Sequence, residues 1–92
     1  MAKTPITRAV STTNPYTVPS GKTFVGDIFP RASGGYGTIR VTTSGGSMDI
    51  YELVNEEPYR TTLKPIVLVA GAQVSIAGGS GGCLLCGFEY DN

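Results

Sequence analysis

Clusters of glycine divide this chain into short segments, and this division restricts the possible folds more than any other feature of the sequence. Thirteen of the 92 residues are glycine, and most of them stand in three clusters, at 34–37, 45–46 and 78–82. Because glycine adopts positive φ angles without steric cost, such clusters are typical of turns. They argue against a helical bundle, since glycine destabilises the interior of a helix. The longest segment without glycine, residues 47–70, contains two prolines and many β-branched residues, so no helix is expected there either.

The segments between the turns carry the alternation that is typical of β-strands. Ile39 and Val41 alternate with polar residues, and Val74 and Ile76 do the same. Strands are predicted at 16–18, 22–29, 37–43, 47–54, 65–69, 72–77 and 83–90. About seven short strands favour an all-β fold, a single small antiparallel β-sandwich of jelly-roll-like type over residues 21–92. A polar loop at 55–64 has room for one short helical turn.

Residues 1–20 differ from the rest of the chain. They are rich in Thr, Ser and Pro, carry only Lys3 and Arg8 as charges, and show weak periodicity. This pattern predicts an extended N-terminal arm that is flexible alone and becomes ordered where it crosses a neighbouring chain. A frayed terminus without a role is the alternative interpretation.

The composition excludes several classes of function. The chain has no histidine, so it holds no Ser-His-Asp triad, no Cys-His pair and no histidine-bearing metal site. Seven basic and seven acidic residues give a net charge of zero, which argues against nucleic acid as a partner because phosphate binding needs clustered cations. No apolar run approaches the ~20 residues of a membrane span, and the N-terminus lacks a secretory pattern. We therefore expect a protein that is not an enzyme, holds no cofactor or metal ion, and has neither a membrane nor a small-molecule substrate as a partner. We also expect it to be synthesised in a cytoplasm.

Cys83 and Cys86 have a CxxC spacing, which in other contexts holds a redox centre or zinc. No second pair of cysteines exists, and positions i and i+3 of a strand lie on opposite faces, roughly 10 Å apart along the chain, which is too far for a disulfide. We interpret both as small apolar residues of a packed strand. Leu85 then shares one face with Cys83, and Phe88 lies on the other, so the strand is apolar on both faces. Either both faces are buried within one chain, or one of them forms an interface with another chain.

Other polar motifs have plain explanations. Glu56 and Glu57 are adjacent in the polar loop, where neighbouring carboxylates diverge, and they lack the spacing of a calcium loop or of a glycosidase pair. The glycine clusters lack the lysine and the following helix of a phosphate-binding loop. The five tyrosines can stack on sugars or anchor protein contacts, and they equally suit hairpin ends and the edge of a core.

Charge is divided unevenly along the chain. Residues 1–46 carry five basic side chains and one acidic one, whereas residues 47–92 carry two basic and six acidic ones. Either the halves interleave within one sandwich and cancel, or the basic arm of one copy lies on an acidic neighbour. A chain this short is marginal in stability alone, and its composition offers no disulfide framework, so association with other chains is the expected support.

Two stretches of the chain are alike. Tyr16-Thr-Val-Pro-Ser-Gly-Lys-Thr-Phe24 and Leu68-Val-Ala-Gly-Ala-Gln-Val-Ser-Ile76 each pass from an apolar residue through a short turn ending in glycine to an alternating strand. With the terminal Gly87-Phe-Glu-Tyr90, they are similar to the small jelly-roll or β-sandwich modules of tailed-phage virions. The resemblance covers residues 16–90, and these modules include capsid decoration (cement) proteins, head fibres and tail-fibre tips.

This resemblance implies a structural virion protein, synthesised in the host cytoplasm, that binds the outer capsid surface as a homotrimer. As a cement protein it would contact the major capsid protein and stabilise the head against internal DNA pressure. The arm residues Ile6, Arg8 and Val10 are expected to bind the capsid, and Leu85 and Phe88 to form the trimer interface.

A carbohydrate- or receptor-binding module of a phage fibre is the alternative. In that case Tyr36, Tyr51 or Tyr59 would supply the stacking surfaces for a sugar.

Overall fold

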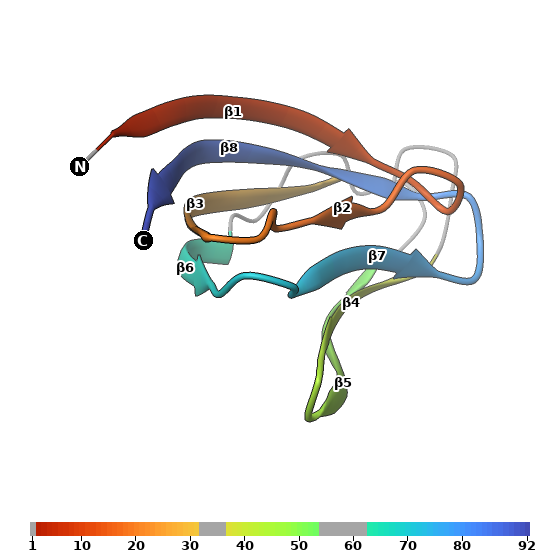
Figure 1. The fold of residues 1–92 in the computed structure, drawn as a ribbon. Helices are drawn as coiled ribbons and strands as arrows, with labels where there is room; N and C mark the ends of the chain where they lie inside the picture. Colours follow the sequence, from red (N-terminus) through yellow and green to blue (C-terminus); the bar gives the residue numbers. More distant parts are fainter. Residues whose placement is uncertain (1, 32–36, 54–62) are drawn as a thin grey trace.

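The structure, a computed structural model, describes residues 2–31, 37–53 and 63–92, and in this part of the chain it contains eight strands and no helix. The strands are β1 (Lys3–Val10), β2 (Tyr16–Thr17), β3 (Lys22–Arg31), β4 (Gly37–Thr43), β5 (Gly46–Leu53), β6 (Leu63–Leu68), β7 (Gln73–Ala77) and β8 (Gly82–Asp91). They form two antiparallel four-stranded sheets, as Figure 1 shows. The all-β sandwich is therefore confirmed, with eight strands rather than about seven. Most of the predicted polar loop at 55–64 lies outside the described residues.

Strand pairing in the two sheets is nested. β1 pairs with β8, β2 with β7, β3 with β6 and β4 with β5, and β8 and β7 also pair with β3 and β4. The resulting orders are β1-β8-β3-β6 in the first sheet and β2-β7-β4-β5 in the second. One long hairpin, with its tip at the β4–β5 turn, is thus folded over on itself, which is the strand order of an eight-stranded jelly roll.

Residues 2–20 belong to this sandwich, in contrast to the extended arm expected from the sequence of residues 1–20. β1 pairs with β8 in one continuous register, from Lys3 opposite Tyr90 to Val10 opposite Cys83. The sequence pattern does not predict this strand because β1 is the edge of its sheet, where threonines occupy exposed positions. Pro5 has no backbone N–H to donate to a neighbouring strand, and an edge strand accepts proline because it has a neighbour on one side only. The alternation is therefore visible only in the few residues that face inward.

The core lies between the two sheets. Its largest fully buried side chains come from both layers: Tyr16, Phe24, Ile28, Ile39, Leu85, Val10, Val18 and Val74. The predicted inward residues Ile39, Val74 and Ile76 are all buried, which confirms the faces assigned to β4 and β7.

Two glycines allow the central strands of the first sheet to approach each other. Gly26 and Gly87 stand directly opposite one another in β3 and β8. A Cβ on Gly26 would come 2.7 Å from the Gly87 Cα and 2.8 Å from the ring of Phe24. Because neither glycine has a side chain, a space remains on the inner surface of the sheet, and the Phe24 ring occupies it.

The two similar stretches of sequence form similar turns. Gly21 has φ 77° and Gly71 has φ 87°, and the residue after each glycine donates a backbone hydrogen bond to the carbonyl three residues before it. Glycine at the third position with positive φ is the requirement of a type II turn. Val18 joins the two turns, because its N–H donates to the Ala72 carbonyl and its own carbonyl accepts from the Gly71 N–H.

Candidate interaction surface

The two cysteines have the positions expected of packing residues. Both thiols are free, Cys83 is buried between the sheets, and Cys86 is half-buried on the opposite face of β8. Burial raises the pKa of the Cys83 thiol to about 12, so at neutral pH it stays protonated and is a poor nucleophile. Nowhere in the described residues do three or more Cys, Asp or Glu side chains gather in a way that could hold a metal ion.

Charged side chains of the two halves of the chain pair with one another on the surface of the sandwich. Lys22 Nζ lies 2.6 Å from an Asp91 carboxylate oxygen, and Arg40 Nε lies 2.7 Å from one of Asp49. Each pair joins a cation from residues 1–46 to an anion from residues 47–92. These pairs favour the interpretation in which the uneven charge cancels within one chain. The hydrogen bond from Arg40 also lowers the pKa of the Asp49 carboxyl. Glu56 and Glu57 lie outside the described residues.

One carboxylate is buried, and a tyrosine binds it. Glu89 is 7% exposed, on the inner face of β8, and accepts a 2.5 Å hydrogen bond from the Tyr16 hydroxyl. The Arg8 guanidinium lies 5.3 Å from the centre of the Tyr16 ring. Burial, with the Glu89 hydrogen bond second, raises the pKa of Tyr16 well above its usual value, so the hydroxyl remains a donor. The cluster ties β2 of one sheet to β8 of the other, and we assign it a structural role.

The residues expected to bind the capsid through an arm lie in β1 instead. Val10 is 2% exposed and belongs to the core, and Ile6 packs against that core. Arg8 alone of the three is exposed. Val10 therefore has no surface to offer a capsid, because inward positions of an edge strand are covered by the opposite sheet.

The two residues expected at a trimer interface lie on opposite faces of β8. Leu85 is 0% exposed, because it packs between the sheets, so its assignment to an interface is corrected. Phe88 points the other way and is half-buried on the outside of the first sheet. The strand is indeed apolar on both faces, but a single chain buries only one of them.

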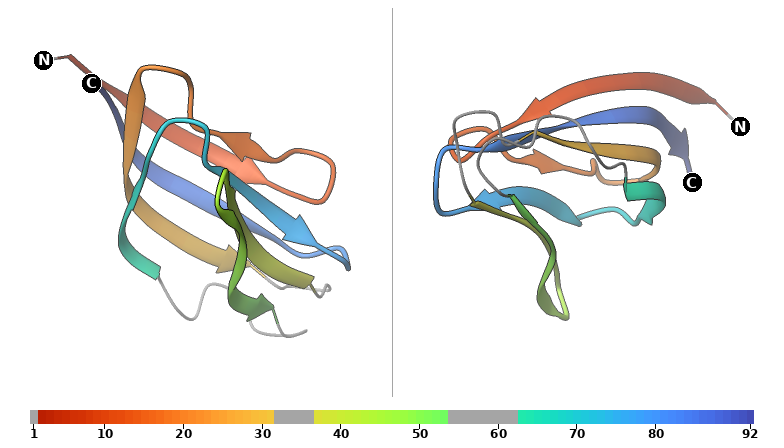
Figure 2. Two further views of the ribbon diagram at one scale, coloured as in Figure 1. Left: turned by 60° about the horizontal axis from the view of Figure 1, so that its bottom comes forward. Right: turned by 180° about the vertical axis from the view of Figure 1, so that it is seen from behind.

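Several apolar side chains lie on the outside of the first sheet. We call the residues that alternate onto it the outer face: Val25, Phe29, Val67, Leu84, Cys86, Phe88 and Tyr90. They come from β3, β6 and β8, three strands that lie side by side in Figure 2. Val67 is 64% exposed, and the others are half-buried. A contiguous apolar surface of this kind on a small chain is typical of a contact with another protein.

Aromatic rings and a few charges mark the outer face. The rings of Phe88 and Tyr90 are 6.2 Å apart, and Lys3 Nζ lies 4.6 Å from the centre of the Phe88 ring. Asp27 stands opposite Cys86 in the register, among apolar neighbours. The surface is therefore suited to a partner that is mainly apolar, and Asp27 is an acidic group within it.

The tyrosines do not gather into a sugar-binding cluster within the described residues. Tyr16 is in the core, Tyr90 lies on the outer face, and Tyr51 is half-buried on β5. Tyr36 and Tyr59 lie outside the described residues.

Comparison with known proteins adds no relative: no protein-family model matches the chain, and no curated protein is similar to it in sequence. The described part of the chain also has no helix with the length and apolar character needed to cross a membrane.

Proposed function

We propose that this protein is a structural component of a tailed-phage particle, a capsid decoration protein that binds the outer capsid surface as a homotrimer and stabilises the head against internal DNA pressure. The observation that carries the proposal is the outer face, an apolar surface on a chain whose described part gathers no reactive or metal-binding side chains. We assign capsid binding to the outer face rather than to Ile6 and Val10, which pack on the core, and this moves Phe88 from the expected trimer interface to the capsid contact.

The fold supports this proposal by analogy. Eight-stranded jelly rolls occur in viral capsid proteins and also in lectins, so the strand order agrees with a virion role without selecting it. Many copies acting together would reinforce a capsid even where each contact is weak.

Co-sedimentation with phage heads tests the proposal. Expanded heads of the encoding phage, stripped of this protein, are mixed with the wild-type chain, with Phe88→Lys and with Ser75→Lys. Both variants add one positive charge, but Ser75 lies on the outside of the second sheet, so only Phe88→Lys should lower capsid binding, by tenfold or more. Equal binding by all three chains would remove the outer face from the contact, and absence of wild-type binding would refute the capsid role.

The carbohydrate-binding alternative has its own outcome. The Phe88–Tyr90 ring pair is the observation that favours it, because two neighbouring half-exposed rings can stack on a sugar. Binding to a glycan array that is lost in Tyr90→Ala, together with no binding to heads, would support a fibre module instead.

A further inference from the structure

The free edge of the first sheet is a second surface that another chain can bind. β1 and β2 are the edges of the two sheets on one side of the sandwich, but β2 has only two residues, whereas β1 has eight. All residues of β1 except Ile6 and Val10 are exposed. Figure 1 shows β1 along the outside of the sandwich, with β8 beside it, and no described strand lies on its other side. An edge of this length presents a row of backbone groups with which a further strand can pair.

The hydrogen bonds of the first sheet show which backbone groups of β1 are directed to the open side. The Asp91 N–H donates to the Ala2 carbonyl over 3.0 Å, and these two residues stand opposite each other when the β1–β8 register is continued by one pair. In antiparallel strands, pairs that exchange hydrogen bonds alternate with pairs that do not. Counting from Ala2, the residues whose N–H and C=O groups point away from β8 are Lys3, Pro5, Thr7 and Ala9.

Two further observations agree with this alternation. Pro5 has no N–H, and the alternation places it where β8 requires no donor. The Asn14 side-chain amide donates to the Ala9 carbonyl over 3.0 Å, which it can do because that carbonyl lies on the open side. Lys3 and Thr7 then each present a donor and an acceptor, while Pro5 presents an acceptor and Ala9 a donor. These six groups have no hydrogen-bond partner within the described residues, so they are available to an added strand.

The charges of β1 select the kind of strand that can be added. Lys3 and Arg8 are its only charged residues, and both are positive. Within the described part of the chain neither forms an ion pair, and each lies over an aromatic ring, Lys3 over Phe88 and Arg8 over Tyr16. Opposite charges on neighbouring strands stabilise the pairing, and like charges destabilise it. β1 of a second copy would bring further cations, so an acidic segment of another protein fits this edge better.

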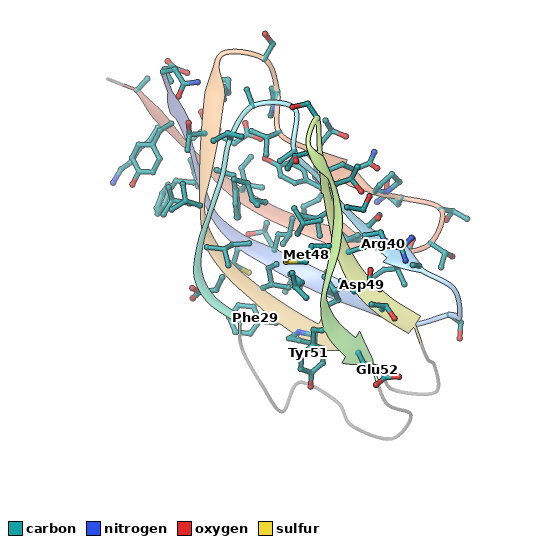
Figure 3. The ribbon with its side chains drawn as sticks, turned by 90° about the horizontal axis from the view of Figure 1, so that it is seen from below. Phe29, Arg40, Met48, Asp49, Tyr51 and Glu52 are labelled. Atoms are coloured by element: carbon teal, nitrogen blue, oxygen red, sulfur yellow. The ribbon has the colours of Figure 1, made fainter. Side chains whose placement is uncertain are left out.

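The other edge strand of eight residues has the opposite charge. β5 belongs to a hairpin that projects from the body of the molecule, as Figures 1 and 2 show. Figure 3 shows its Asp49 and Glu52 on the same side of the hairpin as Arg40, which binds Asp49. β5 itself carries carboxylates and no cation, so it would repel an acidic strand. Of these two long edges, β1 alone attracts such a segment.

We propose that β1 binds an extended acidic segment of another protein, which adds a fifth strand to the first sheet and runs antiparallel to β1. The inference goes beyond the proposed function, since it concerns the sheet edge rather than the outer face and requires no capsid. Addition of a strand to a sheet edge is an established mode of peptide recognition, in which main-chain hydrogen bonds provide affinity. Antiparallel pairing is the more stable arrangement per residue. The acidic residues of the partner then stand opposite Arg8 and Lys3, five positions apart along the segment.

Fluorescence anisotropy with a labelled peptide tests the inference. The probe is Val-Glu-Val-Thr-Val-Thr-Glu, whose glutamates have the spacing of Arg8 and Lys3, and the control peptide has lysine in place of both glutamates. We expect the wild-type chain to bind the acidic peptide with a dissociation constant below about 100 µM, and the lysine peptide at least about tenfold more weakly. Equal binding of the two peptides, or no binding of the acidic peptide up to about 1 mM, would overturn the inference.

Two substitutions in β1 change the number of outward donors without removing a hydrogen bond to β8. Thr7→Pro removes the Thr7 N–H and should weaken binding of the acidic peptide about tenfold, whereas Pro5→Thr supplies a donor and should strengthen binding at least about twofold. Opposite effects of two variants of one strand distinguish pairing with the edge from a general loss of structure. Dissociation constants that stay within about twofold of wild-type in both variants would contradict pairing at this edge.

Hydrogen exchange in the wild-type chain supplies an independent readout if Thr7→Pro folds poorly. The amides of Thr7 and Ala9 should exchange fast in the free chain and at least about tenfold more slowly when the acidic peptide is saturating. The amides of Ile6 and Arg8 should be protected in both states, because they donate to β8. Slow exchange at Thr7 without peptide would contradict the alternation, and peptide protection confined to β5 would place the peptide on the other edge and overturn the inference.

Discussion

Replacing Tyr16 by phenylalanine removes a single oxygen atom from the middle of the sandwich. That hydroxyl is the donor to Glu89, whose carboxylate lies between the sheets and is 7% exposed. Phenylalanine fills the same space, and the contact of the ring with Phe24, at 5.7 Å between centroids, is kept. The substitution therefore isolates the hydrogen bond from the packing.

The cost of Tyr16→Phe follows from what is left behind. A hydrogen bond to a charged group contributes about 1.5–3 kcal/mol, and a buried carboxylate without its donor adds a desolvation penalty. We expect the free energy of unfolding to fall by about 2–4 kcal/mol. In a domain of this size that loss lowers the melting temperature by roughly 10–25 °C.

Chemical unfolding of four chains in urea at pH 7 provides the assay: wild-type, Tyr16→Phe, Glu89→Met and the double variant. Glu89→Met replaces the carboxylate with an apolar side chain of similar length, so the double variant has no unsatisfied group and should lie within about 1 kcal/mol of wild-type. The two substitutions would then couple by at least ~2 kcal/mol. Strict additivity, or a cost of Tyr16→Phe below about 0.5 kcal/mol, would refute the reasoning and would mean that water or Arg8 satisfies Glu89.

Three further predictions concern the sheet, the core thiol and the first strand. Gly87→Ala should lower the free energy of unfolding by more than about 3 kcal/mol in urea melts, because its Cβ would meet the Gly26 backbone at 2.6 Å. Gly45→Ala, whose Cβ would lie 3.7 Å from the Thr43 hydroxyl in ordinary contact, should change it by less than about 1 kcal/mol. Because the pKa of the Cys83 thiol is raised, the folded chain keeps a proton that the unfolded chain loses above pH 9, so the free energy of unfolding should fall by about 1.4 kcal/mol per pH unit between pH 9 and 12. Cys83→Ala should remove this slope below pH 10, a range in which Tyr16 does not yet lose its proton in either state. An unchanged slope in Cys83→Ala would contradict the assignment of the slope to Cys83. A chain that lacks residues 2–10 should lose its cooperative thermal transition in circular dichroism, because the deletion uncovers Val10 and one side of β8; a sharp transition would show that β1 is dispensable.

Much of the sandwich can be predicted from local patterns in the sequence. β4 has the bounds of the predicted strand 37–43, and the turns at Gly21 and Gly71 occur where glycine ends the short turn before an alternating strand. These features depend on residues close together in the chain, which is why composition and alternation find them. The burial of Ile39 and Val74 follows from the same alternation.

Features that depend on distant residues could not be predicted in this way. β1 forms only because β8, more than seventy residues later, offers it a paired edge. Leu85 and Glu89 fall on the same face of β8 by alternation, so a buried carboxylate was a signal in the sequence, but only the fold shows that its donor is Tyr16. The projection of the β4–β5 hairpin depends on how the two sheets diverge, and alternation within one strand carries no information about that.

The central place of β8 has a consequence for the order in which the strands can pair during folding. Both β1 and β3 need β8 as their neighbour, and β8 follows both of them far along the chain. The β4–β5 hairpin is the sole pair of hydrogen-bonded strands that are also consecutive in the described sequence. Because pairing of distant strands must first overcome the entropy of closing a long loop, we expect the β4–β5 hairpin to form early and the first sheet to form late and slowly.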